Sequence, residues 1–154
     1  MNTTDGNVLL SRVTADDSLQ ITTRYGDIST DHTVISGTVR FDTSDGNVSL
    51  NSTDISGSLQ STTRYGDVNA SLLTISGKTK LKTSGGNISL KLDDKSLRHL
   101  NISMTTEYGS LSVPEYAGGS KRRYKEYGHR YDKSSDAGSA CLNVITSDGD
   151  ICLR

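Results

Sequence analysis

A glycine-centred unit recurs along the whole chain and restricts its fold more than any other feature. A threonine stands three residues before each glycine, and a branched aliphatic residue stands two residues after it. The first five glycines recur at every twentieth position and the last two follow at longer intervals; they are Gly6, Gly26, Gly46, Gly66, Gly86, Gly109 and Gly149. Self-similarity at a short fixed period is typical of stacked repeat architectures.

Each unit has the pattern of two short strands. Apolar and polar residues alternate after the glycine, as in "NVSL" at Asn47–Leu50, and this period of two is typical of a half-buried strand. We expect one buried column of Val8, Ile28, Val48, Val68, Ile88, Leu111 and Ile151. A second column follows the "ISG" corners at Ile35, Ile55 and Ile75, while Leu19, Val39 and Leu59 point inward from the next strand. We expect the corner glycines to supply backbone angles that other residues resist.

A single unit has too few aliphatic residues to fold alone, so neighbouring units have to stack. The sequence therefore predicts an all-β fold: a parallel β-solenoid of about seven 20-residue repeats with a thin aliphatic core. Connections between parallel strands are right-handed in most proteins, so the coil is expected to be right-handed. The whole chain, 1–154, forms one domain, with a basic, tyrosine-rich insertion at 114–140.

Two coil lengths remain open. The stretch "TTRYGD" occurs at Thr22–Asp27 and again at Thr62–Asp67, and the residue before the glycine alternates between Asp and Tyr in the first four units. The coil then spans either one unit, with a corner residue that alternates from coil to coil, or two units that form similar halves of a forty-residue turn. We favour the one-unit coil, because two strands of about five residues and two tight corners fill it.

The pattern Thr-x-x-Gly-[Asn/Asp]-[Val/Ile], the "ISG" corners and the closing "GSACLNVITSDGDICL" resemble the toastrack family of adhesin-like β-solenoid domains. The similarity covers nearly the whole chain, with 114–140 as a variable insertion. The resemblance implies a β-solenoid fold, a surface or cell-envelope setting and adhesion as a suggested role. It supplies no catalytic residue. The N-terminal "MNTTDGNVLL" lacks the basic and apolar regions of a signal peptide.

Two groups of residues are candidates for binding. The first is the set of tyrosine corners, Arg24, Tyr25, Arg64, Tyr65 and Tyr108, because aromatic and guanidinium faces stack on sugars and other flat ligands. The second is the basic run of the insertion, Lys121, Arg122, Arg123, Tyr124 and Lys125, which suits a polyanion or an anionic glycan. The alternative is structural: tyrosines that cover coil corners, and a hairpin whose charges face water.

Other classes of function are not favoured. The formal net charge is -1, so nucleic acid is an unfavoured partner, and no apolar run approaches the roughly 20 residues of a membrane span. His32, His99 and His129 lie in no metal-binding or catalytic pattern, so we expect no enzyme, metal site or cofactor. The alternation places Cys141 and Cys152 outward on opposite sheets, as free thiols.

Two hypotheses for function remain. The first is a non-enzymatic structural or assembly module of a surface or extracellular type, which self-associates head to tail into an oligomer or filament. Its interface would be formed by two uncapped solenoid ends, Val8 and Leu10 at one end and Ile151 and Leu153 at the other. The second is an adhesin-like module that binds glycan or polyanion through the tyrosine corners or the basic insertion.

Overall fold

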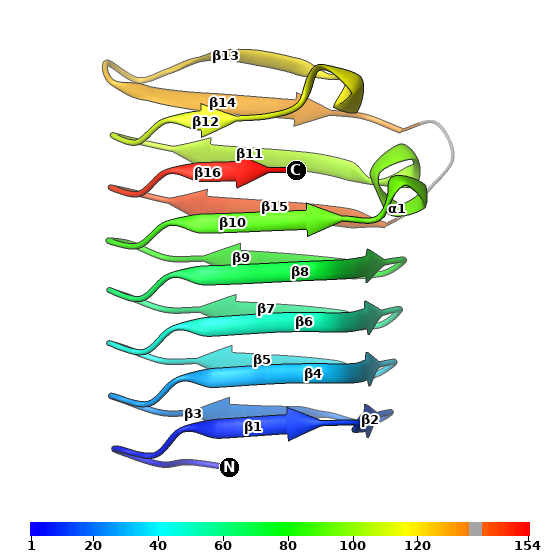
Figure 1. Ribbon diagram of the computed structural model, residues 1–154. Coiled ribbons are helices and arrows are strands. Elements are labelled where there is room, and N and C mark those ends of the chain that lie inside the picture. Colours follow the sequence, from blue (N-terminus) through cyan, green and yellow to red (C-terminus); the bar gives the residue numbers. More distant parts are fainter. Residues whose placement is uncertain (136–139) are drawn as a thin grey trace.

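The computed structural model describes residues 1–135 and 140–154, which form two facing β-sheets (Figure 1). The fold is all-β, and its sheets are built mainly from parallel strands. Sheet B contains, in spatial order, β1 (Val8–Ser11), β4 (Ile28–Ile35), β6 (Val48–Ile55), β8 (Val68–Ile75), β10 (Ile88–Leu92), β16 (Ile151–Leu153) and β12 (Leu111–Ser112), and β2 (Thr14–Ala15) also pairs with β4. Sheet A contains β3 (Leu19–Thr22), β5 (Thr38–Asp42), β7 (Ser58–Thr62), β9 (Lys78–Lys82), β15 (Cys141–Thr146), β11 (Asn101–Thr106), β14 (Gly128–Lys133) and β13 (Ser120–Tyr124).

The strand register favours the shorter of the two coil lengths. Ile28 pairs with Val48, and Val48 pairs with Val68, so directly neighbouring strands come from consecutive sequence units in this part of the chain. Sheet A has the same spacing, with Val39 paired to Leu59. The all-β class and the parallel sheets are as expected for a β-solenoid, whereas the right-handed coil and the number of repeats stay predictions.

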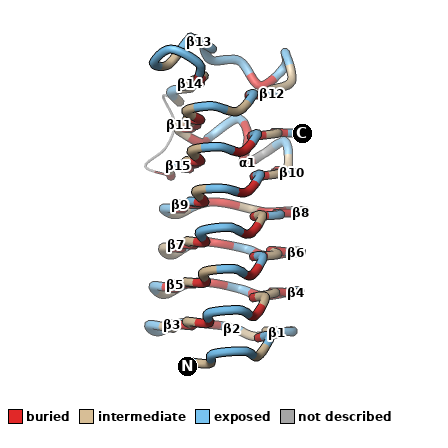
Figure 2. The backbone as a smooth tube through the Cα atoms, turned by 90° about the vertical axis from the view of Figure 1, so that its left-hand side faces the viewer, coloured by how far each residue is buried: buried red, intermediate tan, exposed pale blue. Residues whose placement is uncertain are grey.

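The core is a set of aliphatic columns between the two sheets (Figure 2). The predicted first column is buried throughout: Val8, Ile28, Val48, Val68, Ile88, Ile151 and Leu111 are each at most 8% exposed. The second column, Ile35, Ile55 and Ile75, is also buried. Leu19 and Leu10 are only partly buried, because they lie in the first coil, which has no coil beneath it among the described residues.

The threonine and glycine of each corner form a hydrogen-bonded ladder. The Thr43 hydroxyl accepts from the backbone N–H of Gly46 at 3.2 Å and donates to the carbonyl of Gly26 in the preceding coil at 3.1 Å. The expected reason for these glycines is wrong, because Gly118 and Gly119 are the only described glycines with positive φ. The corner glycines are needed for close stacking: a Cβ atom on Gly46 would lie 2.0 Å from the Gly26 carbonyl oxygen.

The coils do not stack in chain order. The C-terminal strands β15 and β16 lie inside the stack, between β9 and β11 in one sheet and between β10 and β12 in the other (Figure 1). The predicted C-terminal assembly face is therefore wrong. Ile151 and Leu153 are 1% and 2% exposed, because each strand edge of β16 is already paired.

A short helix replaces one corner of the solenoid. The helix α1 (Asp94–His99) was not predicted from the repeat pattern. Asp93 caps its N-terminus, and the Asp93 side chain accepts from the Ser96 N–H. Leu97 and Leu100 are buried and fill the end of the core there. The Ser96 hydroxyl also accepts from the backbone N–H of Ile75, at 3.0 Å. No helix among the described residues is long and apolar enough to cross a membrane.

The insertion adds an antiparallel hairpin to the end of sheet A. The short 3-10 turn η1 (Glu115–Ala117) leads into β13 and β14, and β14 pairs with β11. Tyr131 is 3% exposed and its hydroxyl donates to the Gly118 carbonyl, so the hairpin covers this end of the core. Positions 136–139 of the predicted insertion lie outside the described residues.

Candidate functional site: a tyrosine edge

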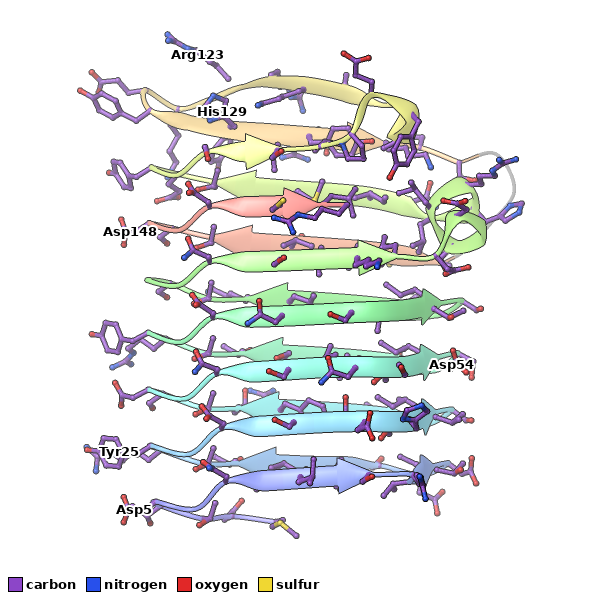
Figure 3. The ribbon with its side chains drawn as sticks, in the orientation of Figure 1. Asp5, Tyr25, Asp54, Arg123, His129 and Asp148 are labelled. Carbon is purple, nitrogen blue, oxygen red and sulfur yellow. The ribbon has the colours of Figure 1, made fainter. Side chains whose placement is uncertain are left out.

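One long edge of the solenoid carries the residues that precede the corner glycines. Because the last coil lies inside the stack, their order along this edge is Asp5, Tyr25, Asp45, Tyr65, Gly85, Asp148 and Tyr108. Figure 3 shows Asp5, Tyr25 and Asp148 pointing outward on this edge. The backbone is held by bonds between coils, for example from the Tyr65 N–H to the Ser44 carbonyl at 2.9 Å.

The three predicted corner tyrosines are exposed and do not cover the ladder. Tyr25, Tyr65 and Tyr108 are 53%, 65% and 64% exposed. The hairpin adds Tyr127, which is 63% exposed and stacks on Tyr108 with ring centroids 6.2 Å apart. We call Tyr25, Tyr65, Tyr108 and Tyr127 the tyrosine edge. Tyr127 was not among the predicted site residues, because nothing in the repeat shows that the hairpin tip reaches the third corner.

The charged neighbours of the tyrosines differ between corners. The Arg24 guanidinium lies over the Tyr25 ring, 5.2 Å from its centroid, which keeps that ring oriented. Arg64 is also exposed beside Tyr65. Glu107 takes the arginine position at the third corner and forms an ion pair with Lys125 of the hairpin, which raises the pKa of Lys125. Tyr25 and Tyr65 are two coils apart, about 9.5 Å along the solenoid axis.

Most of the predicted basic run is already bonded, either within the hairpin or to the coil beneath it. Arg122 pairs with Asp132 at 3.0 Å, and Lys121 donates to the Leu111 carbonyl. Lys125 lies 5.6 Å from the centroid of the half-buried Tyr124 ring, in addition to its bond to Glu107. Arg123 is exposed at the top of the molecule (Figure 3). Strand alternation places Arg122 and Tyr124 on one face of β13 and Lys121 and Arg123 on the other, and much of the charge of the run is paired, so its role in binding stays a prediction.

Asp132 organises the positive charge of the hairpin. The Arg130 guanidinium donates to the Asp132 carboxylate at 2.8 Å, and this bond is the main reason why the pKa of Asp132 is lowered. The Ser103 hydroxyl of β11 donates to the same carboxylate at 3.0 Å. This cluster attaches β14 to the solenoid through side chains as well as through the strand ladder.

The remaining candidate chemistry is dispersed. His32 bonds Asp31 on β4, His99 lies on α1, and His129 contacts the Gly109 carbonyl. Within residues 1–135 and 140–154, no group of three or more His, Cys, Asp or Glu side chains could hold a metal ion. Cys141 and Cys152 lie on the outward faces of sheet A and sheet B, so the core separates the two thiols.

Comparison with known proteins supports the family resemblance. The model of the family described as Toastrack DUF4097 matches residues 1–154, the whole chain. Searches of curated proteins and of solved structures returned no match. The family match points to a structural or adhesin-like module.

Proposed function

The chain belongs to the Toastrack family, and we propose that it is a non-enzymatic, adhesin-like module whose tyrosine edge binds a neutral carbohydrate. One observation carries the proposal: all four rings of the tyrosine edge lie on one side of a rigid solenoid and are more than half exposed. Burying such rings would have stabilised the fold, so their exposure favours an external partner.

The chemistry of the edge suits sugar rings. An exposed tyrosine offers a flat apolar face for the C–H groups of a pyranose and a hydroxyl for hydrogen bonding. The carboxylates of Asp45 and Asp148 stand between the tyrosines, and that of Asp5 stands beside Tyr25; all three can accept hydrogen bonds from sugar hydroxyls. The inter-coil hydrogen bonds fix the spacing of these groups before any ligand arrives, which lowers the entropic cost of binding.

The test is affinity electrophoresis in gels that contain soluble β-glucan, mannan or chitin oligomers. We expect at least one polysaccharide to retard the wild-type chain and the double variant Tyr25→Ala/Tyr65→Ala to lose roughly 10–100-fold in affinity, since each stacked ring contributes about 0.5–1.5 kcal/mol. Tyr116→Ala is the matched control, because Tyr116 is 71% exposed but lies in η1, away from the edge.

Two outcomes would contradict the proposal. One is that none of the three polysaccharides retards the wild-type chain. The other is that Tyr116→Ala reduces retardation as much as the double variant, which would show that exposed tyrosines bind regardless of position. All three residues are exposed, so the melting temperatures of the variants should stay close to the wild-type value.

A second candidate function is self-association through the first coil. In the described chain the outer edge of β1 pairs with no strand, and Leu10 and Leu19 are only partly buried there. The hairpin covers the opposite end, so contact between two open ends would be isologous and would form a dimer, not a filament. Light scattering tests this: a dimer that Leu10→Lys makes monomeric supports the candidate, and a monomeric wild type at high concentration contradicts it.

A further inference from the structure

The outward surface of sheet A, which we call the sheet A face, carries an excess of positive charge. Strand alternation places six basic and two acidic side chains on it: Arg40, Lys78, Lys80, Lys82, Arg122 and Arg130, with Asp42 and Asp132. The face therefore has a formal charge of +4 in a chain whose net charge is -1. The remaining carboxylates lie elsewhere, many of them at the coil corners.

Among the described residues, three lysines of β9 are the free cations of this face. Arg40 is paired with Asp42, while Arg122 and Arg130 share Asp132. Lys78, Lys80 and Lys82 are exposed and form no ion pair with any other part of the described chain. Alternate residues on a strand are about 6.7 Å apart, so the three ammonium groups form a row about 13 Å long across the face.

The face is hollowed along the solenoid axis. A shallow groove of about 460 Å³ is lined by Arg40, Lys78, Lys80, Gln60 and Asn143. A second hollow of about 270 Å³ begins at Asn143 and reaches Arg130, Tyr124 and Glu107, whose carboxylate is neutralised by its ion pair with Lys125. Both hollows reach Asn143, and together they extend over the strands from β5 to β14, about 24 Å at the usual strand spacing; we call this pair of hollows the trough.

We propose that the sheet A face binds an anionic polysaccharide, whose carboxylate or sulfate groups meet Lys78, Lys80 and Arg40 in the trough and Lys82 beside it. The polymer lies along the trough, where Ser58, Gln60 and Asn143 offer hydroxyl and amide groups to its uncharged hydroxyls. The half-buried Tyr124 stacks on a ring at the hairpin end.

The shape and composition of the face favour this ligand over other polyanions. The described strands of the sheet A face all belong to one sheet, which presents no separate helix or ribbon to the major groove of duplex DNA. Single-stranded nucleic acid is bound on several successive aromatic rings, whereas the trough is lined by Tyr124 alone among the aromatic residues described there. The long, narrow trough lined by hydroxyl and amide groups fits a linear polymer better than a planar lipid surface.

The proposal does not depend on the tyrosine edge, and calorimetry with defined polymers tests it. The probes are heparin, which carries sulfate and carboxylate, polygalacturonate, which carries carboxylate alone, and dextran as the neutral control. We expect salt-dependent binding of heparin or of both charged polymers, with no binding of dextran. If heparin alone binds, the face requires sulfate groups. If both charged polymers bind, carboxylate groups are sufficient.

The variant Lys78→Gln/Lys80→Gln/Lys82→Gln should lose about tenfold or more in affinity and show a shallower dependence of log K on log salt. The matched control is Arg12→Gln/Lys91→Gln/Arg154→Gln, which removes the same charge from the sheet B side and should bind as wild type. Replacing the three lysines by arginine should preserve binding. Tyr25→Ala/Tyr65→Ala should also preserve it, which separates this surface from the tyrosine edge.

Three results would overturn the proposal. The first is that the wild-type chain binds neither charged polymer at low salt. The second is that the lysine variant and the control lose affinity equally, which would indicate general charge attraction. The third is that vesicles of phosphatidylserine and phosphatidylcholine, or duplex DNA, bind the chain more tightly than either polysaccharide, which would assign the face to a membrane or to nucleic acid.

Discussion

Gly85 and Gly86 are neighbours in one corner, and the same substitution should have opposite effects at the two positions. A Cβ atom on Gly86 would lie 2.0 Å from the Gly66 carbonyl oxygen and 2.5 Å from its carbonyl carbon. A Cβ atom on Gly85 would meet only Tyr65 Cδ1 at 3.4 Å and the Arg64 carbonyl at 3.7 Å. Neither glycine has a positive φ, so the difference arises from packing alone.

The cost of Gly86→Ala follows from the ladder. Relief of the clash to an ordinary contact of about 3.5 Å requires the backbone to move by about 1.5 Å. Such a shift breaks three hydrogen bonds: Thr83 to the Gly66 carbonyl, Gly86 N–H to Thr83, and Thr146 to the Gly86 carbonyl. At about 1 kcal/mol for each bond and 1–3 kcal/mol for overpacking, the free energy of unfolding falls by roughly 4–6 kcal/mol.

Thermal unfolding followed by circular dichroism measures both variants. Gly86→Ala should lower the melting temperature by roughly 10–20 °C for a chain of this size. Gly85→Ala should leave it unchanged or raise it slightly, because alanine restricts the unfolded chain and stabilises by about 0.4–1 kcal/mol where the backbone permits it. Equal melting temperatures for the two variants would refute the idea that the glycines serve close stacking.

Three further predictions concern the core, the positive φ at Ser52 and the corner carboxylates. Val48→Asp should cost more than about 4 kcal/mol in thermal unfolding, since it buries an unpaired charge at a fully buried position; a melting temperature near wild type would contradict this. Ser52→Gly should stabilise the chain by up to about 1 kcal/mol, because Ser52 has a φ of 47°, and denaturant midpoints measure it, with no gain as the contrary result. Asp150 accepts a hydrogen bond from the Ser110 N–H, which lowers the pKa of Asp150 in the folded chain. Its contribution to the free energy of unfolding is therefore present above the unfolded-state pKa and is lost as the pH falls through the lower folded-state pKa. Asp150→Asn should therefore be somewhat less stable than wild type at neutral pH and lose less stability in acid, as melting temperatures across this pH range would show.

The repetitive part of the fold could be predicted because each buried position recurs in register. Val8 and its equivalents are read directly from the regular spacing of the units, and all are buried. The role of the paired threonine and glycine could not be predicted in the same way. It depends on a carbonyl 17 residues earlier in the chain, which only the stacking of coils brings near the threonine hydroxyl.

The candidate sites were predicted less completely than the core. The corner tyrosines follow from the repeat, but their exposure and the addition of Tyr127 depend on where the hairpin lies. The basic run was visible in the sequence, yet its partners Glu107 and Asp132 come from other positions. The three lysines of β9 can also be read from the sequence. They stand out as free cations only in the structure, where their neighbours on the face are uncharged or already paired.

The out-of-order stacking has a signal in the sequence, at Ser110 and Pro114. The Asn or Asp after each corner glycine accepts from the backbone N–H of the next coil, and this ladder runs from Asn7 up to Asp150, which accepts from Ser110. Ser110 stands where the other coils carry Asn or Asp, and it has no side-chain carbonyl to offer a further coil. Pro114 follows β12 closely, and proline is tolerated at sheet edges because it lacks the N–H that an inner strand donates. Both residues favour a position at the end of the stack for the coil that contains β12, so the C-terminal coil lies between that coil and the coil of β10. This order puts Asn143 at the centre of the sheet A face, where both hollows reach it.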